Sequence, residues 1–252
     1  MERQPIRTRL ARVEKDRILV RGRDLCQDLL GNITFSDMAG LVLMGRMPNA
    51  GERRMIDAML VVLVEHGMVS SVVSARLTYA TAPESIQAAV AASLLGAGSV
   101  HLGSSDICAR MLYEGLQQEP DLDKAAANIV RQHLAAKVRI PGIGHRTHPA
   151  GDPRAVRLLE IAREGELYGT YCQLLEKVVA ETERQGPRRL PINVTGAIGC
   201  ISLDLGLPWQ IAKGFALVGR TLGTMAHLRE EIEMPAADAM NALIRSSLEI
   251  AD

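Results

Sequence analysis

The 252-residue chain has 47% hydrophobic and 23% charged residues, and its 29 basic and 29 acidic side chains balance to a formal net charge of zero. Such a chain forms one or two globular domains, and its charge balance gives no general attraction for nucleic acid or an anionic membrane. Aromatic residues make up only 3%. The core must therefore consist mainly of aliphatic residues and Met, which favours helices over a β-sandwich.

Cysteine spacing and hydropathy exclude further classes. No two cysteines form a C-x-x-C pair, so neither a zinc site nor a disulfide framework is predicted; they are Cys26, Cys108, Cys172 and Cys200. No apolar signal segment follows the Arg-rich residues 1–9, and the longest apolar run, 55–64, is too short to span a bilayer. We expect a cytoplasmic protein with no membrane partner.

Helix signals begin early in the chain. Apolar residues at helical spacing predict a helix over 35–42, with Ser36 or Asp37 as its cap. Asn49 and Glu52 have the spacing of a capping box ahead of a helix that runs to 64. Thr81 and Glu84 repeat this spacing before an Ala-rich helix that ends at 96–98.

Further helices are predicted in the second half. Asp121 caps a helix to about 137, Asp152 with Pro153 begins one to 164, Pro208 begins one to about 231, and the last covers 236–250. Strand patterns are weak and confined to 17–21 and 190–194. The predicted fold class is all-α.

The loop over 137–154 is the richest candidate for chemistry. It is rich in Pro and Gly and holds two histidines and four cationic groups. Gly142 and Gly144 allow the backbone to approach a ligand closely, and loop amides with Arg side chains suit phosphates and carboxylates. His145 and His148 lack a nearby third ligand, so no metal site is predicted.

Three other side chains are candidates that also have structural interpretations. His101 lies at a joint between helices, before a helix that Ser104 or Ser105 caps, and His66 ends an apolar helix. Arg220 lies within the apolar segment 211–226, where it needs either an ion-pair partner or an anionic ligand.

In chain order, these motifs resemble the citrate synthase superfamily, which includes citryl-CoA lyases and the C-terminal lyase part of ATP-citrate lyases. The resemblance covers nearly the whole chain. The motifs that carry it are Val20-Arg-Gly-Arg-Asp-Leu, Gly31-Asn-Ile-Thr-Phe-Ser-Asp-Met-Ala, Gly45-Arg-Met-Pro, Glu65-His66-Gly67, Val100-His101-Leu-Gly, Pro141-Gly-Ile-Gly-His145-Arg, Asp152-Pro-Arg154, Asn193-Val-Thr195 and Gly219-Arg220-Thr-Leu-Gly.

The resemblance implies an all-α homodimer. A large domain, residues 1–103 plus 192–252, would carry the dimer contact, and a smaller inserted domain, residues 104–191, would bind coenzyme A. The substrates would be an acyl-CoA and a di- or tricarboxylate.

The resemblance also implies site roles. His101 would donate to the thioester oxygen, and His145 would be the acid or base at the oxygen of the bond that is made or broken. The substrate-binding residues would be His66, Arg154 and Arg220. The coenzyme A site would contain Arg139, Gly142, Gly144 and Arg146.

Thr195 departs from the family pattern, which has a catalytic Asp directly after the Asn-Val pair. A hydroxyl is far too weak a base to take a proton from an acetyl methyl group near neutral pH. Three interpretations stay open. Glu65 or Asp106 replaces the missing carboxylate, the enzyme acts only as a lyase with Thr195 or water relaying the carbon proton, or the substrate differs.

The first functional expectation is lyase-like cleavage of citryl-CoA, or of a related 3-hydroxyacyl-CoA, to an acyl-CoA and a 2-oxo acid. The chain is shorter than ordinary citrate synthases and lacks their longer C-terminal segment, which also favours a lyase. The alternatives are condensation of an acyl-CoA with a 2-oxo acid, and a non-catalytic paralogue that binds coenzyme A thioesters.

Overall fold

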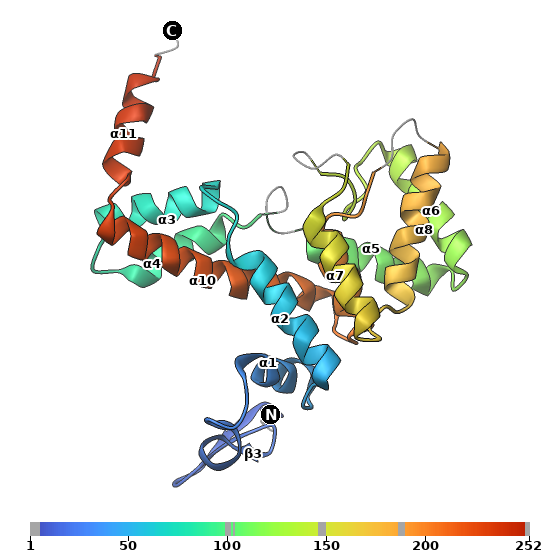
Figure 1. Ribbon diagram of the computed structural model, residues 1–252, viewed down its shortest axis with the longest axis horizontal. Helices are drawn as coiled ribbons and strands as arrows, with labels where there is room; N and C mark the ends of the chain where they lie inside the picture. Colours follow the sequence, from blue (N-terminus) through green and yellow to red (C-terminus); the bar gives the residue numbers. More distant parts are fainter. Residues whose placement is uncertain (1–5, 99–101, 103, 146–149, 186–189, 250–252) are drawn as a thin grey trace, which may run out of the picture.

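The computed structural model describes residues 6–98, 102, 104–145, 150–185 and 190–249 (Figure 1). Helices dominate these residues, which confirms the predicted all-α class. They are α1 Phe35–Met44, α2 Ala50–Val64, α3 Ser70–Thr81, α4 Ile86–Leu95, α5 Ser105–Gln118, α6 Leu122–Ala136, α7 Pro153–Glu164, α8 Thr170–Gln185, α9 Val194–Asp204, α10 Ala212–Glu233 and α11 Ala237–Ser246.

A small antiparallel sheet precedes the helices. Its strands are β1 Ala11–Val13, β2 Ile18–Val20 and β3 Arg23–Asp24, with β2 in the middle. Arg12 is paired with Leu19, and Val20 with Arg23. β2 lies within the predicted strand at 17–21, whereas the two flanking strands were not predicted. A single π-helical turn, η1 Leu25–Leu29, connects the sheet to α1.

The helix starts follow their capping chemistry. Thr34 caps α1, because its hydroxyl accepts from the Asp37 amide at 3.1 Å while the Asp37 carboxylate accepts from the Thr34 amide at 3.0 Å. The prediction of Ser36 or Asp37 as the cap was therefore wrong. The boxes and caps at Asn49, Asp121 and Asp152 form as predicted.

The Thr81–Glu84 capping box does not form. Thr81 is the last residue of α3, and its hydroxyl donates to the carbonyls of Leu77 and Thr78. α4 begins only at Ile86. A Thr that satisfies carbonyls at a helix end looks the same in sequence as one that caps a helix start.

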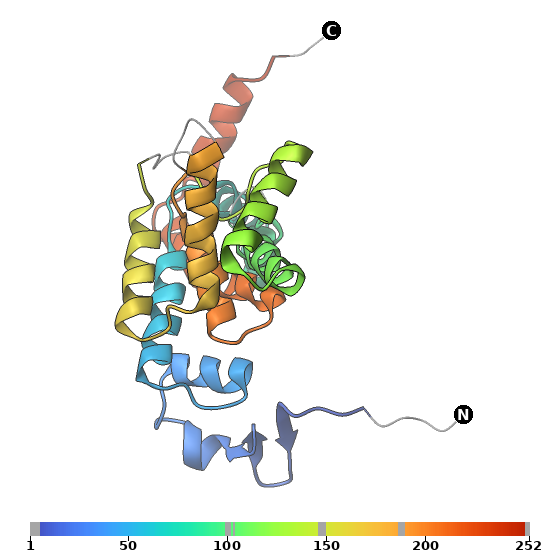
Figure 2. The same cartoon turned by 90° about the vertical axis from the view of Figure 1, so that its right-hand side faces the viewer.

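The helices form two groups joined by α2. α10 packs against α2, α3 and α4, while α5, α6, α7 and α8 gather on the other side of the molecule (Figure 1). Figure 2 shows the N-terminal strands and α11 at opposite ends. The largest core cluster includes Met55 and Met59 of α2 and Leu174 of α8.

Helix α9 bears on the predicted domain division. Nine of its eleven residues are buried, and it packs against α5, α7 and α8. It therefore contacts the inserted segment closely although it lies after the predicted boundary at 191. The division into 1–103 plus 192–252 and 104–191 stays a prediction. No helix of the described residues is both long enough and apolar enough to cross a membrane.

Candidate active site

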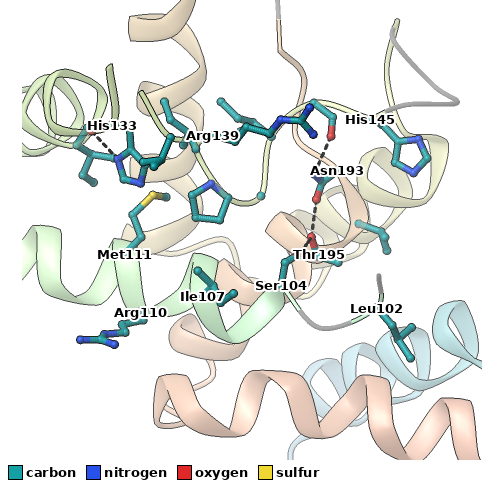
Figure 3. Close-up of a pocket in the computed structure, with 18 of the residues that line it drawn as sticks. Leu102, Ser104, Ile107, Arg110, Met111, His133, Arg139, His145, Asn193 and Thr195 are labelled. Atoms are coloured by element: carbon teal, nitrogen blue, oxygen red, sulfur yellow. Dashed lines mark hydrogen bonds between the residues drawn. The ribbon is translucent and has the colours of Figure 1, made fainter. Parts of the chain in front are cut away.

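A cavity of about 990 Å³ lies where the two groups of helices meet. Its wall is formed by the end of α2, the start of α3, the length of α5, part of α6, the loop before residue 145, the starts of α7 and α9, and the middle of α10. Figure 3 shows the residues around Thr195 and the α5–α6 end. The cavity brings together eight of the ten predicted site residues, namely His66, Arg139, Gly142, Gly144, His145, Arg154, Thr195 and Arg220. The other two, His101 and Arg146, lie outside the described residues.

Backbone hydrogen bonds join the loop at 141–145 to the segment before α9. The Gly144 amide donates to the Pro191 carbonyl at 2.7 Å, and the Asn193 amide donates to the Gly142 carbonyl at 3.0 Å. The Asn193 side-chain amide donates to the Gly144 carbonyl at 2.8 Å. The predicted extended piece at 190–194 is thus a single bridge, Ile143 with Ile192, that leads into α9.

Gly142 is required by packing as well as by backbone conformation. Its φ is +88°, and a Cβ atom there would lie 2.9 Å from Gly196 Cα and would overlap the Cys108 sulfur. Gly142 therefore lets the loop cross directly over the start of α9. The sequence predicted that Gly142 lets the backbone approach a ligand closely. It does line the cavity, but contact with α9 excludes a side chain.

Asp152 connects the starts of α7 and α9. Its fully buried carboxylate pairs with the Arg154 guanidinium at 3.0 Å and accepts from the Val194 amide at 2.9 Å. Burial alone would raise the pKa of Asp152, but these hydrogen bonds outweigh burial and hold it below its usual range. Arg154 also lies 3.3 Å from His145 Nε2. Because guanidinium has no acceptor, that nitrogen of His145 accepts the hydrogen bond.

Two glycines of α10 that flank Arg220 allow this helix to pack closely against α2. A Cβ at Gly219 would lie 2.9 Å from the Leu60 carbonyl oxygen, and one at Gly223 would overlap the Val64 carbonyl oxygen. The Gly-Arg-Thr-Leu-Gly motif thus lets α10 pack against the backbone of α2. Arg220 is 2% exposed, and its Nε and Nη1 have no hydrogen-bond partner among the described residues. Such buried donors suit an anionic ligand.

His66 lies two residues after the end of α2 and lines the same cavity. Partial burial, followed by the positive charges of Arg154 and Arg220, lowers its pKa. The neutral imidazole is therefore the favoured form near neutral pH, and burial likewise lowers the pKa of Arg220. Among the described residues, His66, Arg154 and Arg220 thus place three nitrogen-bearing side chains on this wall, and of these Arg154 is paired with Asp152.

The Thr195 hydroxyl belongs to a chain of hydrogen bonds. Ser104 Oγ donates to Thr195 Oγ1 at 2.9 Å, and Thr195 Oγ1 donates to Asn193 Oδ1 at 2.7 Å (Figure 3). Ser104 occupies the cap position of α5 but makes no side-chain cap bond. The sequence suggested only a capping role for it, and no motif signals its contact with Thr195.

Neither Glu65 nor Asp106 is among the described residues of the cavity wall. The Asp106 carboxylate accepts from the Ile107 amide at 2.9 Å, and Glu65 faces His227. Within the described part of the wall, the carboxylate is that of Glu114, which pairs with Arg110 at 2.7 Å. Among the described residues, the side chains that hydrogen-bond to the Thr195 hydroxyl are Ser104 and Asn193, a hydroxyl and an amide.

The part of the cavity between α5 and α6 contains polar residues that were not predicted from the sequence. Arg110, Asn128, Gln132 and His133 lie along α5 and α6. His133 Nδ1 donates to the Ile129 carbonyl at 2.8 Å, which fixes the imidazole against α6. These residues belong to ordinary amphipathic helices, in which a polar face carries no distinguishing motif.

Comparison with known proteins identifies the family. Residues 41–247 match the model of the citrate synthase C-terminal domain. The chain belongs to the citrate synthase family. A citrate synthase from Synechocystis is 30% identical over 204 residues, which cover 77% of this chain and 48% of that protein. This member of the family thus spans about half the length of the curated relatives that it matches.

Solved structures of the citrate synthase fold extend the comparison. The citryl-CoA lyase from Hydrogenobacter thermophilus has a TM-score of 0.88 and 34% identity, over 99% of this chain and 95% of that one. An ATP citrate lyase from Methanosaeta concilii, in complex with (3S)-citryl-CoA, has a TM-score of 0.74 and 20% identity over 94% of this chain and 42% of that one. The second match shows a shared fold.

Proposed function

We propose that this member of the citrate synthase family is a lyase that cleaves citryl-CoA, or a related 3-hydroxyacyl-CoA with additional carboxylates, to an acyl-CoA and a 2-oxo acid. The observation that carries the proposal is the similarity to a citryl-CoA lyase across 99% of this chain and 95% of that structure. Coenzyme A takes part as the thioester substrate.

Cleavage needs a base at oxygen and a stabilised enolate. In the proposed reaction His145 takes the proton of the substrate hydroxyl, a C=O bond forms, and the adjacent C–C bond breaks. The electron pair passes into the thioester enolate, for which His101 is the proposed donor. Arg154 and Arg220 hold the carboxylates, since a planar guanidinium matches two carboxylate oxygens. His66 completes this pocket as a neutral donor.

The surroundings of Thr195 favour cleavage over condensation. Condensation begins with removal of a proton from a weakly acidic methyl group, which needs a base, and Thr195 is a hydroxyl that donates to Asn193. Cleavage instead ends with an enolate, a strong base that can take its proton from water. The same substitution makes a non-catalytic coenzyme A thioester-binding protein the second candidate.

The proposed coenzyme A site is the loop with Arg139, Gly142, Gly144 and Arg146. Arg139 and the two glycines line the cavity wall, and Arg110 adds a second guanidinium toward the α5–α6 end. Loop amides and basic side chains of this kind suit the phosphates of a nucleotide.

We also propose a cytoplasmic homodimer. On one face of α10, Val218, Leu222 and Met225 are 48%, 60% and 49% exposed, and an apolar face of this kind is typical of an interface. All four cysteines are free thiols, and Cys172 and Cys200 remain unlinked with their sulfurs 3.4 Å apart. This supports a reducing compartment.

The deciding experiment supplies the purified protein with citryl-CoA and, separately, with acetyl-CoA plus oxaloacetate, while free thiol and oxaloacetate are followed. We expect release of oxaloacetate from citryl-CoA and no condensation. Condensation would instead establish a synthase. Inactivity in both directions, together with coenzyme A thioester binding by calorimetry, would favour the binding protein.

A further inference from the structure

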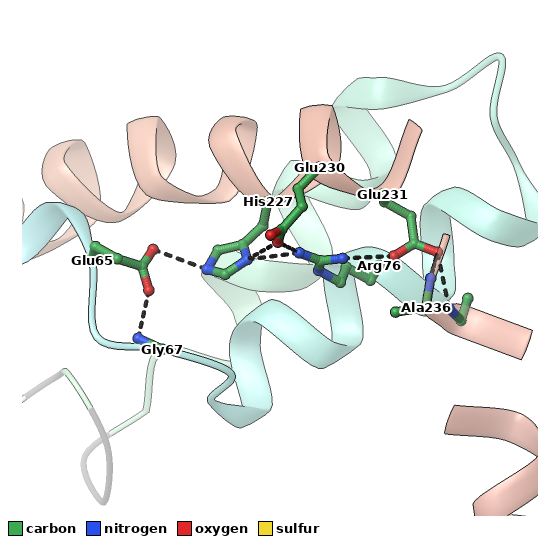
Figure 4. A network of polar contacts seen from close by, with 8 residues as sticks. Glu65, Gly67, Arg76, His227, Glu230, Glu231 and Ala236 are labelled. Atoms are coloured by element: carbon green, nitrogen blue, oxygen red, sulfur yellow. Dashed lines mark hydrogen bonds and ion pairs between the residues drawn. The ribbon is translucent and has the colours of Figure 1, made fainter. Parts of the chain in front are cut away.

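Helix α10 presents two groups on one face, at positions 220 and 227. Seven residues make about two helical turns, so both side chains point to the same side. Arg220 lines the cavity, whereas His227 reaches Glu65, which directly precedes the cavity residue His66 (Figure 4). One helix face therefore contacts both the ligand space and the turn that carries His66.

Glu65 ties that turn together. Its Oε1 accepts from the backbone amides of His66 at 2.8 Å and Gly67 at 2.5 Å, and its Oε2 lies 2.9 Å from His227 Nε2. Burial would raise the pKa of Glu65, but His227 and the two amides together lower it. The ionised carboxylate thus joins the backbone at 66–67 to α10.

The orientation of His227 is set from its other side. Its Nδ1 lies 3.1 Å from Arg76 Nη2, and because guanidinium only donates, Nδ1 accepts. The ring hydrogen is therefore on Nε2, the nitrogen that lies 2.9 Å from the Glu65 carboxylate. Arg76 is 2% exposed and is itself held by ion pairs to Glu230 and, at 2.9 Å, to Glu231. This network fixes the imidazole before any ligand binds.

Gly219 and Gly223 bring the two backbones together, but they supply no directional polar group. The Glu65–His227 contact supplies one at the end of α2, one turn beyond Gly223.

We propose that Glu65 and His227 are positioning residues, which hold the turn of His66 in register with Arg220 and thereby set the affinity for the substrate carboxylates. The affinity part of this inference rests on the proposed function. The placement of the turn does not, because it is a property of the unliganded protein.

The test uses four variants of the full chain. His227→Ala removes the contact. His227→Gln replaces it, because a Gln amide can donate to Glu65 and accept from Arg76. In Glu65→Gln, one carboxylate oxygen becomes an amide NH2. If the remaining oxygen still accepts from the backbone amides, the NH2 faces the His227 N–H; if the oxygen faces His227, the backbone amides lose their acceptor. Arg229→Ala is the matched control, since it breaks only the exposed Arg229–Glu233 pair on the same helix.

Two readouts separate positioning from general stability. NMR amide exchange of His66 and Gly67 is measured without ligand, and KM and kcat are measured with citryl-CoA. His227→Ala and Glu65→Gln should each increase the hydrogen-exchange rates of the His66 and Gly67 amides about tenfold. Each should also raise KM about tenfold and change kcat much less. His227→Gln should restore most of both effects, and Arg229→Ala should match the wild type.

Unchanged amide exchange in both His227→Ala and Glu65→Gln would overturn the inference, and faster exchange with an unchanged KM would overturn its affinity part. If the wild type does not turn over citryl-CoA, the proposed function fails. The exchange comparison then still decides whether Glu65 and His227 hold the turn.

Discussion

Burial of the Arg220 guanidinium costs free energy in the unliganded protein. Two of its nitrogens lack partners among the described residues, and Glu65 is the carboxylate whose charge acts on it most directly. A bound carboxylate would satisfy those donors with charge-assisted hydrogen bonds. At the scale of one residue, the cavity wall is therefore better matched to an anionic ligand than to water.

Arg220→Ala should weaken binding of citryl-CoA by roughly 1.5–3 kcal/mol, or about 10- to 150-fold in KM, because charge-assisted hydrogen bonds are lost. The melting temperature should stay the same or rise, since an unpaired buried cation is removed. Steady-state kinetics and thermal unfolding check both parts. Arg157→Ala, on the exposed side of α7, is the control, and unchanged kinetics for Arg220→Ala would remove Arg220 from the site.

Thr195→Asp should introduce the missing base at the position where Ser104 already donates a hydrogen bond. We expect a gain of proton exchange at the methyl group of acetyl-CoA, because a carboxylate can accept a carbon-bound proton that a hydroxyl cannot. Proton NMR in deuterated water follows the exchange. Thr195→Asn is the matched control, because Asn has the shape of Asp but carries no charge. Equal exchange in the Asp and Asn variants would show that the carbon chemistry lies elsewhere.

At the scale of elements, three helix starts were predicted correctly together with their caps. α2, α6 and α7 are capped by Asn49, Asp121 and Asp152, each of which accepts from backbone amides of the first turn that follows it. The caps of α8 could not be predicted, because the amides at Gly169, Tyr171 and Cys172 donate to Asp204 of α9. That cap exists only after the chain has folded.

In the candidate site, too, only residues with a local sequence pattern could be predicted. The loop at 141–145 and Arg220 are marked by glycines at fixed spacing, so local patterns identify them. α9 has almost no polar face and therefore no amphipathic period to detect. Ser104 reaches Thr195 across 91 positions in the sequence, and His133 lies on an ordinary helix face. Contacts between elements carry no local signal.

Asp152→Asn should destabilise the fold by about 2–4 kcal/mol at pH 7, because it leaves Arg154 and the Val194 amide without their shared carboxylate. Since the folded pKa of Asp152 is lowered, its stabilisation is present above the unfolded value of 3.8 and is lost as pH falls through the folded value. Urea unfolding of both proteins from pH 7 to pH 3 measures this. A difference that does not shrink below about pH 4 would contradict the assigned charge state.

At the scale of the whole molecule, the apolar residues of α10 divide between two roles. Phe215, Ala216 and Leu228 are buried against the other helices, whereas Val218, Leu222 and Met225 face outward. α11 adds Leu243 and Ile244, which are also exposed, and it extends away from the rest of the chain (Figure 1). A single copy therefore leaves much apolar surface in water at this end.

Leu222→Asp should convert the proposed homodimer to monomers, because it places a charge in the centre of the exposed α10 face. Sedimentation velocity at micromolar protein concentration checks the mass. Leu134→Asp changes a residue of α6 that is 55% exposed on the other side of the molecule, and it should leave the mass unchanged. A monomeric wild type would contradict the dimer.

The contact between Gly142 and Gly196 has a consequence for redesign of this protein. At both positions a single added methyl group would collide with the opposite backbone, so the loop and α9 act as one rigid floor to the cavity. A library that seeks new substrates should keep these two positions constant and vary Ile107, Met111 and Val138 on the walls. Those side chains can change volume while the floor, and the proposed catalytic groups on it, stay where they are.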